Sequence, residues 1–168
     1  INRIFVTYLA PGLRDSELLR EVDKNNFVFI GRVEHKKNLL TIIQAFKNIS
    51  DQNINLILIG KAGIGAEEII KAASGDRRIK LLGWQEPDQV KVLLKSAIAV
   101  IVPSGYEGFG MPVLEAWQNQ VPVIAAASGS LPEICAQACL LVNPQDVEGF
   151  TKAMHELSVN TQLCHSLI

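Results

Sequence analysis

A glycine-rich segment after residue 102 carries residue types that can bind an anion. The stretch from Pro103 to Gly110 reads PSGYEGFG, and Pro112 is typical of the first turn of a helix. Backbone N–H groups of Gly108, Phe109 and Gly110 at a helix start suit a phosphate or diphosphate, because the positive end of the helix dipole lies behind them. Since glycine also lets a ligand approach the backbone closely, the segment predicts an anion site. A glycine-rich turn before a helix is common, so the segment alone is a weak signal.

Two cations that suit the same anion follow an apolar run at residues 27–30. Arg32 comes directly after Gly31, and Lys37 follows Lys36. A guanidinium can bind phosphate oxygens bidentately, and an ammonium adds a mobile point charge. The plain alternative is that both are solvated surface charges. Their joint placement with the glycine segment decides between the two readings.

Two carboxylates, Glu107 and Glu115, flank the glycine segment with seven residues between them. Because a carboxylate repels a phosphate, we expect both to face hydroxyl groups, as carboxylates do when they accept hydrogen bonds from a ribose or a hexose. For Glu115 the alternative is a residue of the first helical turn that only favours the helix dipole.

The elements that must position these residues alternate regularly from residue 27 onward. Short β-branched runs alternate with segments of helical period, and most of the runs are continuously apolar, which indicates strands covered on both faces. The fold class is therefore α/β, a doubly wound, mainly parallel six-stranded sheet with helices on both faces. In the common strand order 3-2-1-4-5-6, strands one and four meet at the switch point where ligands bind, which brings Arg32, Lys37 and the glycine segment into one crevice. The expected strands are Phe27–Ile30, Asn55–Ile59, Ile79–Leu82, Ile98–Val102, Val121–Ala125 and Leu140–Val142.

Local signals at the ends of elements add three expectations. Ser130 and Glu133, with a proline between them, predict a capping box at a helix start. A closing helix is expected from about Asp146, and Ile4–Tyr8 is a candidate for an additional edge strand.

Composition excludes several classes of function. The 168 residues are 48% hydrophobic and carry 16 basic and 17 acidic side chains, which indicates one globular domain and no main partner among nucleic acids. No run of 18 apolar residues is present, so no membrane-spanning helix is expected. The glycine cluster Gly60–Gly65 has neither GxGxxG nor Walker A spacing, which argues against hydride transfer and nucleoside triphosphate hydrolysis. The cysteines, Cys135, Cys139 and Cys164, lack CxxC spacing, so we expect reduced thiols of a cytosolic protein and no metal site.

Four segments carry a family resemblance: GRVEHKKN, LILIGKAG, IKLLGWQ and VPSGYEGFGMPVLEAW. From about Phe27 to Leu157 the chain resembles the C-terminal, donor-binding domain of family 4 glycosyltransferases, whose GT-B architecture has two facing Rossmann-like domains. EGFGMPVLE looks like the paired-glutamate motif of that family. Two departures are Gln120 and Ser130, which stand where members often have glycine.

The resemblance implies retaining transfer of a hexose from a nucleotide-diphosphate sugar to a glycan or lipid-linked acceptor, with no metal or other cofactor. Residues 1–168 would form one nucleotide-sugar-binding domain. An N-terminal acceptor domain would lie outside this chain, so the isolated domain is expected to be inactive. The full protein would be cytoplasmic and would contact a membrane only through that missing domain.

The resemblance also implies roles for individual residues. Arg32 and Lys37 would hold the donor diphosphate and stabilise it as the leaving group. Glu107 would contact the hydroxyl groups of the donor sugar, and Glu115 those of the ribose. Main chain near Gln85 would contact the base. The catalytic set is then Glu107, Arg32 and Lys37, and the binding set is Gly31, Arg32, Lys37, Gln85, Glu107, Gly108, Phe109, Gly110, Met111 and Glu115.

Two rival functions share such a domain. A nucleotide-sugar epimerase would bind the same donor but would need catalytic groups from another domain. A non-catalytic nucleotide-binding module would bind without turnover. Product analysis of the full-length protein separates the epimerase from a transferase, and a bound nucleotide without turnover in that protein would favour the binding module.

Overall fold

Six strands run parallel in one sheet, in the order β3-β2-β1-β4-β5-β6. The computed structural model describes residues 24–168, so the edge strand expected at Ile4–Tyr8 lies outside the described residues. The doubly wound α/β class and the strand order are both confirmed, and β1 and β4 are neighbours as predicted. The strands are β1 (Asn26–Ile30), β2 (Asn55–Ile59), β3 (Ile79–Gly83), β4 (Ala97–Val102), β5 (Val123–Ala126) and β6 (Leu140–Val142).

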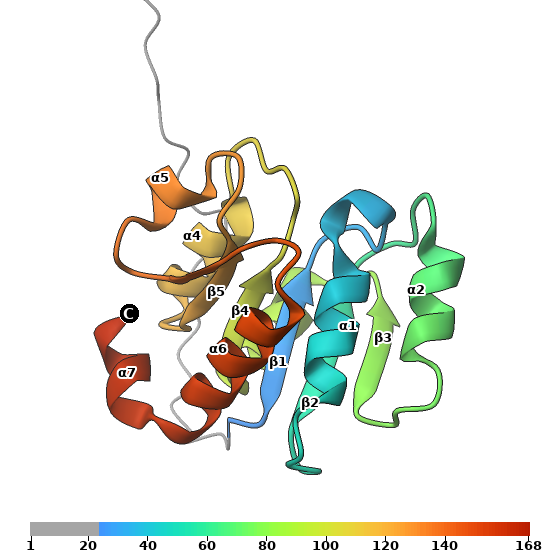
Figure 1. The fold of residues 1–168 in the computed structure, drawn as a ribbon, viewed down its shortest axis with the longest axis horizontal. Helices are drawn as coiled ribbons and strands as arrows, with labels where there is room; N and C mark the ends of the chain where they lie inside the picture. Colours follow the sequence, from blue (N-terminus) through green and yellow to red (C-terminus); the bar gives the residue numbers. More distant parts are fainter. Residues whose placement is uncertain (1–23) are drawn as a thin grey trace, which may run out of the picture.

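Helices cover both faces of this sheet. α1 packs beside α2 and α6 in front of the sheet in the view of Figure 1, whereas α3 packs on β1 and β4, and α4 on β4 and β5. This division follows from right-handed crossovers, because the chain first winds from β1 toward β3 and then from β4 toward β6. The helices are α1 (Leu39–Lys47), α2 (Ala66–Ala73), α3 (Pro87–Lys95), α4 (Met111–Gln118), α5 (Leu131–Cys135), α6 (Val147–Val159) and α7 (Thr161–Ser166), with a 3-10 turn η1 at His35–Lys37.

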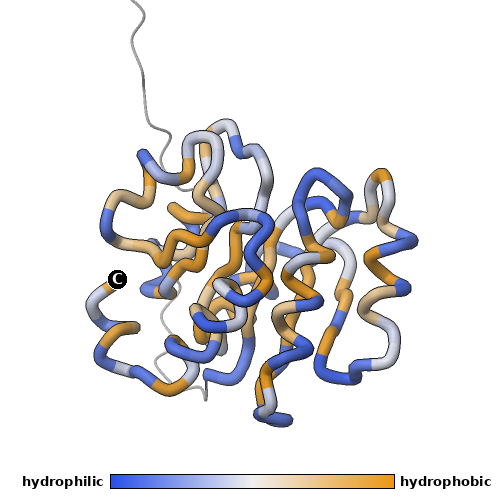
Figure 2. Tube along the Cα trace, in the orientation of Figure 1, coloured by the Kyte–Doolittle hydropathy of each residue, from blue (hydrophilic) through white to orange (hydrophobic). Residues whose placement is uncertain are grey.

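The core lies along the central strands. All six residues of β4 are buried, and the most apolar stretches of the chain follow the sheet in Figure 2. β5 begins two residues later than predicted, at Val123, because Pro122 has no N–H to donate to the ladder. Pro122 still accepts a hydrogen bond from the Val100 N–H at 2.9 Å.

The predicted helix starts have different outcomes. α6 begins as expected, with the Asp146 carboxylate accepting a hydrogen bond from the Gly149 N–H at 2.8 Å. The capping box at Ser130 is wrong, because Ser130 has helical backbone angles and its hydroxyl donates to the Glu107 carbonyl instead. A capping box does occur at the start of α3, between Glu86 and Gln89.

Candidate functional site

The carboxyl ends of β1 and β4 meet at the edge of the sheet where the strand order reverses. β1 leads through Gly31 into η1 and α1, and β4 leads through the glycine segment into α4, so these loops gather at one edge in Figure 1. Parallel α/β sheets bind ligands at this point. The predicted crevice is therefore present in the topology.

An ion pair joins the two loops. The Lys37 Nζ lies 2.7 Å from the Glu107 Oε2, and only 19% of the Lys37 side chain and 18% of the Glu107 side chain are exposed. The pair borders a cavity of about 460 Å³ lined by Lys36, Lys37, Gly105, Tyr106, Glu107 and Gly108. The structure thus brings together one predicted cation, one predicted carboxylate and the glycine segment.

Asn38 fixes the turn that presents Lys37. Its backbone is left-handed, with φ 55°, a conformation that asparagine tolerates better than most residues. Its side-chain Nδ2 donates to the carbonyls of Pro103, at 3.2 Å, and Pro144, at 2.6 Å. One amide therefore ties together the loops after β1, β4 and β6. The sequence reasoning did not identify this residue, although an asparagine just before a helix was a usable signal.

The loop that carries Glu107 is held from behind by the turn after β5. The Glu107 carbonyl accepts hydrogen bonds from the Ser130 N–H at 3.1 Å and the Ser130 hydroxyl at 2.9 Å. The Ser128 hydroxyl donates to the Ser104 carbonyl at 2.6 Å. Gly129, with φ +56°, lies so close to Glu107 that a Cβ would stand 2.6 Å from the Glu107 carbonyl oxygen. The backbone of the loop is therefore held by contacts with the turn that contains Ser128, Gly129 and Ser130.

Arg32 occupies a different position from Lys37. Its side chain is 64% exposed, and its Nε lies 3.6 Å from the Glu34 Oε2. The Glu34 Oε1 in turn lies 3.2 Å from the Lys36 Nζ. Gly31, which precedes Arg32, lies against the ring of Phe29. Arg32 is thus on the expected turn, but its ion pair is with Glu34 of the same turn.

Glu115 lies in the second turn of α4, whereas the helix-dipole interpretation requires it in the first turn. α4 begins at Met111 with Gly110 as its N-cap, so Glu115 is the fifth helical residue and not part of the first turn. The reading of Glu115 as a first-turn residue that favours the dipole is therefore wrong. Burial raises the pKa of its carboxyl group. Gly110 has φ +74°, a left-handed backbone that favours glycine.

Gln85 lies apart from the ion pair. Its Nε2 donates to the Leu82 carbonyl at 2.8 Å, directly after the edge strand β3. β2 separates β3 from β1, so Gln85 follows the same end of the sheet but two strands away from Lys37. A base contact at Gln85 therefore requires a ligand that reaches across this end of the sheet.

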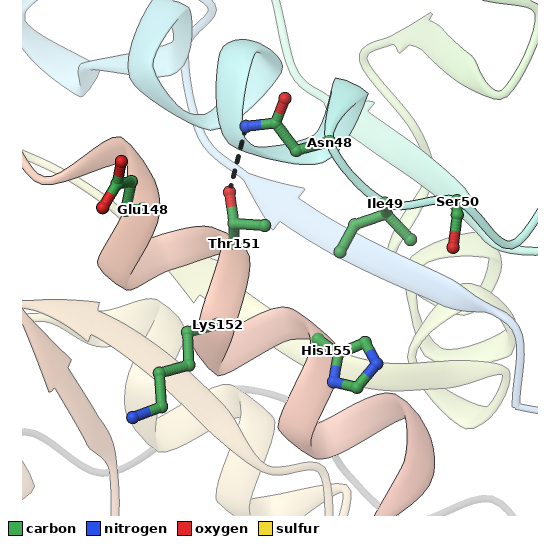
Figure 3. A pocket seen from close by; sticks show the side chains of 7 residues that line it. All are labelled: Asn48, Ile49, Ser50, Glu148, Thr151, Lys152 and His155. Atoms are coloured by element: carbon green, nitrogen blue, oxygen red, sulfur yellow. Dashed lines mark hydrogen bonds between the residues drawn. The ribbon is translucent and has the colours of Figure 1, made fainter.

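A second hollow, of about 310 Å³, lies between the end of α1 and α6. Figure 3 shows Asn48 pointing at Thr151, with the Asn48 Nδ2 3.4 Å from the Thr151 Oγ1. α1 starts at the carboxyl ends of the strands and ends here, so this hollow lies at the opposite end of the sheet from Lys37. The Thr151 hydroxyl already donates hydrogen bonds to the carbonyls of Ala45 and Val147. We assign no chemistry to it.

Residues 24–168 contain neither a cluster of metal-ligating side chains nor a membrane-spanning helix. In this range no group of three or more His, Cys, Asp or Glu side chains could hold a metal ion. None of the described helices is long and apolar enough to cross a bilayer.

Comparison with protein families gives a match over most of the chain. The model of the family described as glycosyl transferases group 1 matches residues 14–168. The chain belongs to the group 1 glycosyltransferases. The resemblance carried by the glycine and paired-glutamate segments is thereby confirmed.

Curated relatives of this glycosyltransferase chain are longer than the chain itself. It is 31% identical over 130 residues to O-antigen chain mannosyltransferase B of Escherichia coli, a match that covers 74% of this chain and 34% of the relative. It is 32% identical over 168 residues to an uncharacterized glycosyltransferase, MJ1178, of Methanocaldococcus jannaschii, covering 99% of this chain and 47% of the relative. The chain therefore spans a third to a half of the length of these relatives.

Solved structures of other proteins share the fold of this chain. Sucrose-phosphate synthase from Thermosynechococcus elongatus superposes with a TM-score of 0.75 at 27% identity, over 86% of this chain and 39% of that one. The Anabaena protein HepE, solved with UDP and glucose, gives a TM-score of 0.77 at 21% identity, over 86% of this chain and 41% of that one. At that identity the second likeness shows the fold alone, which agrees with the Rossmann-like class.

Proposed function

We propose that this chain is the donor-binding half of a retaining glycosyltransferase that transfers a hexose from a nucleotide-diphosphate sugar to a glycan or lipid-linked acceptor. The observation that carries the proposal is the ion pair between Lys37 and Glu107, which places a cation and a carboxylate beside the glycine segment at the switch point. The names of the relatives support it, because they include an O-antigen chain mannosyltransferase, and one structural neighbour was solved with UDP and glucose.

Lys37 has the hydrogen-bonding capacity for two tasks at once. An ammonium group has three N–H donors. One of them points to the Glu107 Oε2, which leaves two for oxygens of a diphosphate. Glu107 therefore orients Lys37 without preventing it from binding the leaving group.

Glu107 also keeps capacity for the donor sugar. Lys37 contacts its Oε2, so its Oε1 can accept a hydrogen bond from a sugar hydroxyl. We therefore assign Glu107 to the hexose, as a ligand for hydroxyl groups, and not as a covalent nucleophile. Glu115, half-buried in the second turn of α4, is assigned to the ribose.

The chemistry that this half supplies is stabilisation of the leaving group. The diphosphate gains negative charge as the glycosidic bond breaks, so fixed cations and N–H donors bind it more strongly in the transition state than in the ground state. Arg32, Lys37 and the backbone of Gly108 to Met111 supply them, and in this proposal they act without a metal ion or another cofactor. Gln85 would contribute main-chain contacts to the base.

The acceptor belongs to another part of the protein in this proposal. The chain spans at most about half of its curated relatives, which leaves room for an N-terminal acceptor domain. We propose that the full protein acts in the cytoplasm and contacts a membrane only through that domain. Purified 168-residue protein should then transfer no sugar, and acceptor glycosylation by it would contradict the division into halves.

Calorimetry on the chain tests donor binding directly. A nucleoside diphosphate among UDP, GDP and ADP should bind, and at 100 times its dissociation constant it should stabilise the fold by about 2.7 kcal/mol. Lys37→Met should weaken binding by about 1.5–3 kcal/mol, the range of a charge-assisted hydrogen bond. Lys152→Met is the matched control, because Lys152 lines the hollow at the opposite end of the sheet. Equal affinities of the wild type and Lys37→Met would refute the site.

The two glutamates are separated by a second comparison. Glu115→Gln should weaken the nucleoside diphosphate and the nucleotide-sugar alike, whereas Glu107→Gln should weaken the nucleotide-sugar more. If both substitutions weakened the nucleoside diphosphate equally, the assignment of hexose and ribose would be wrong. Retention of the anomeric configuration is checked by proton NMR of the product of the full-length protein.

A further inference from the structure

Glu34 is a buried carboxylate that the proposed reaction does not yet use. Among residues 24–168 it is the only buried charged residue, and 10% of its side chain is exposed. Burying an ionised carboxylate is costly unless opposite charges and hydrogen bonds compensate. The position therefore calls for an account of what the carboxylate does.

Each oxygen of Glu34 faces a different cation. Oε2 lies 3.6 Å from the Arg32 Nε, and Oε1 lies 3.2 Å from the Lys36 Nζ. Both cations are on the surface, with 64% of the Arg32 side chain and 74% of the Lys36 side chain exposed. A buried anion thus anchors two side chains that extend into solvent, and the group of three keeps a net charge of +1.

The backbone holds Glu34 firmly on both sides. The Val33 N–H donates to the Lys61 carbonyl at 3.0 Å, and the His35 N–H donates to the Ile64 carbonyl at 3.0 Å. The Glu34 side chain lies directly on Gly63, where a Cβ would stand 2.8 Å from the Glu34 Oε2. The β2–α2 loop therefore fixes the carboxylate in place. Ion pairs with exposed cations alone would not fix it.

We propose that Glu34 is a positioning residue for the donor diphosphate, which it serves by holding Arg32 and Lys36 at the carboxyl edge of the sheet. This inference rests on the proposed function. Glu34 pairs with the Nε of Arg32, which leaves the two terminal guanidinium nitrogens to bind a phosphate bidentately. Lys36 lines the cavity beside Lys37, so Glu34 fixes a second cation there.

Two effects of Glu34 on an anion oppose each other. Its negative charge repels a diphosphate, but its contacts spare Arg32 and Lys36 the entropy cost of becoming fixed when the ligand binds. Fixing one flexible side chain changes affinity by roughly three- to tenfold. The repulsion is the smaller effect, because both oxygens already face cations and the carboxylate lies under Gly63. Removing the charge should therefore weaken binding.

The test measures binding of UDP and of inorganic pyrophosphate to the 168-residue chain by calorimetry. Glu34→Gln should lower both affinities by about three- to tenfold for each cation released. Glu68→Gln is the matched control, because Glu68 is an exposed carboxylate paired with His35 on the neighbouring segment, with 3.1 Å between the His35 Nε2 and the Glu68 Oε2. Its affinities should equal those of the wild type.

A comparison in a background without the two cations separates positioning from a general structural effect. In a background that carries Arg32→Ala and Lys36→Met, Glu34→Gln should cause less than a twofold further loss, because the cations it positions are gone. An equal loss in that background and in the wild type would overturn the inference, as would an unchanged or higher affinity of folded Glu34→Gln.

A second variant covers the case in which Glu34→Gln does not fold. Glu34→Asp keeps the charge but withdraws the carboxylate from Arg32 by one methylene, so it should also weaken UDP and pyrophosphate. Wild-type affinity in Glu34→Asp would overturn the inference. If the wild type bound none of UDP, GDP and ADP, the proposed function itself would fail, whereas normal wild-type binding with an unaffected Glu34→Gln refutes the role of Glu34 alone.

Discussion

Gly129 offers a sharp test of how the loop of Glu107 is held. A Cβ at Gly129 would stand 2.6 Å from the Glu107 carbonyl oxygen and 2.9 Å from its nitrogen, and both are backbone atoms that cannot swing aside like the end of a side chain. Its φ of +56° adds strain for any other residue. Gly129→Ala should therefore destabilise the fold through two separate effects.

The expected size of the effect follows from these two terms. A left-handed backbone costs a non-glycine residue roughly 1–2 kcal/mol, and overpacking costs roughly 1–3 kcal/mol, so Gly129→Ala should lose about 2–5 kcal/mol. For a domain of this size, the thermal midpoint should fall by about 4–20 °C. The nucleotide-sugar should also bind more weakly, because Glu107 moves with its backbone.

Two control variants separate the terms in a thermal unfolding assay. Gly75→Ala has a positive φ of +110° but nothing within 4 Å of its Cβ, so it should show the strain alone, about 1–2 kcal/mol. Gly105→Ala lies on the same loop as Glu107 with neither feature, and should change stability by less than about 0.5 kcal/mol. A midpoint of Gly129→Ala equal to that of Gly75→Ala would show that the contact with Glu107 yields freely, and the reasoning would fail.

Two further predictions concern α4. Burial raises the pKa of Glu115 above its ordinary value of 4.5, so the folded protein binds this proton more tightly than the unfolded chain, and stability falls as the pH rises through 4.5 and above. Glu115→Gln should therefore raise the thermal midpoint at neutral pH and leave it unchanged well below pH 4.5; equal midpoints at neutral pH would contradict this. The Trp117 Nε1 is buried and has no hydrogen-bond partner among residues 24–168, so Trp117→Phe should cost about 1 kcal/mol or less, and a loss of 3 kcal/mol or more in chemical denaturation would reveal a missed partner.

The sequence predicted well what depends on pattern and topology. Mostly apolar runs marked the six strands, and the strand order predicted that Lys37 and the glycine segment share one crevice, where Lys37 and Glu107 are in contact across 70 residues of chain. Contacts that depend on side-chain geometry were not accessible in this way. Ser130 fits the local pattern of a helix cap, yet its hydroxyl donates to the carbonyl of Glu107, which is distant in sequence.

Roles that depend on tertiary contacts were the hardest to predict, even within the GRVEHKKN segment. An asparagine before a helix indicates a turn, but Asn38 acts through two carbonyls that are close only in the folded chain, so the local pattern does not show which loops it joins. In the sequence, Glu34 is one of several charged residues in a turn. Its burial by the β2–α2 loop is a tertiary property that the sequence pattern does not show. The same limit applies to Glu115. Helix α4 begins at Met111, directly after the left-handed backbone of Gly110, so Glu115 lies outside the first turn in which a carboxylate favours the helix dipole.

The hydrogen bonds of Asn38 bear on the order in which the molecule folds. Its amide closes one span of 65 residues to Pro103 and another of 106 residues to Pro144. Contacts between such distant parts of a chain form late, because the loop entropy must be overcome before they add stability. The turn that presents Lys37 is therefore completed only after β6 has joined the sheet. A nascent chain that stops before Pro144 would carry every assigned donor-site residue and still lack the finished site.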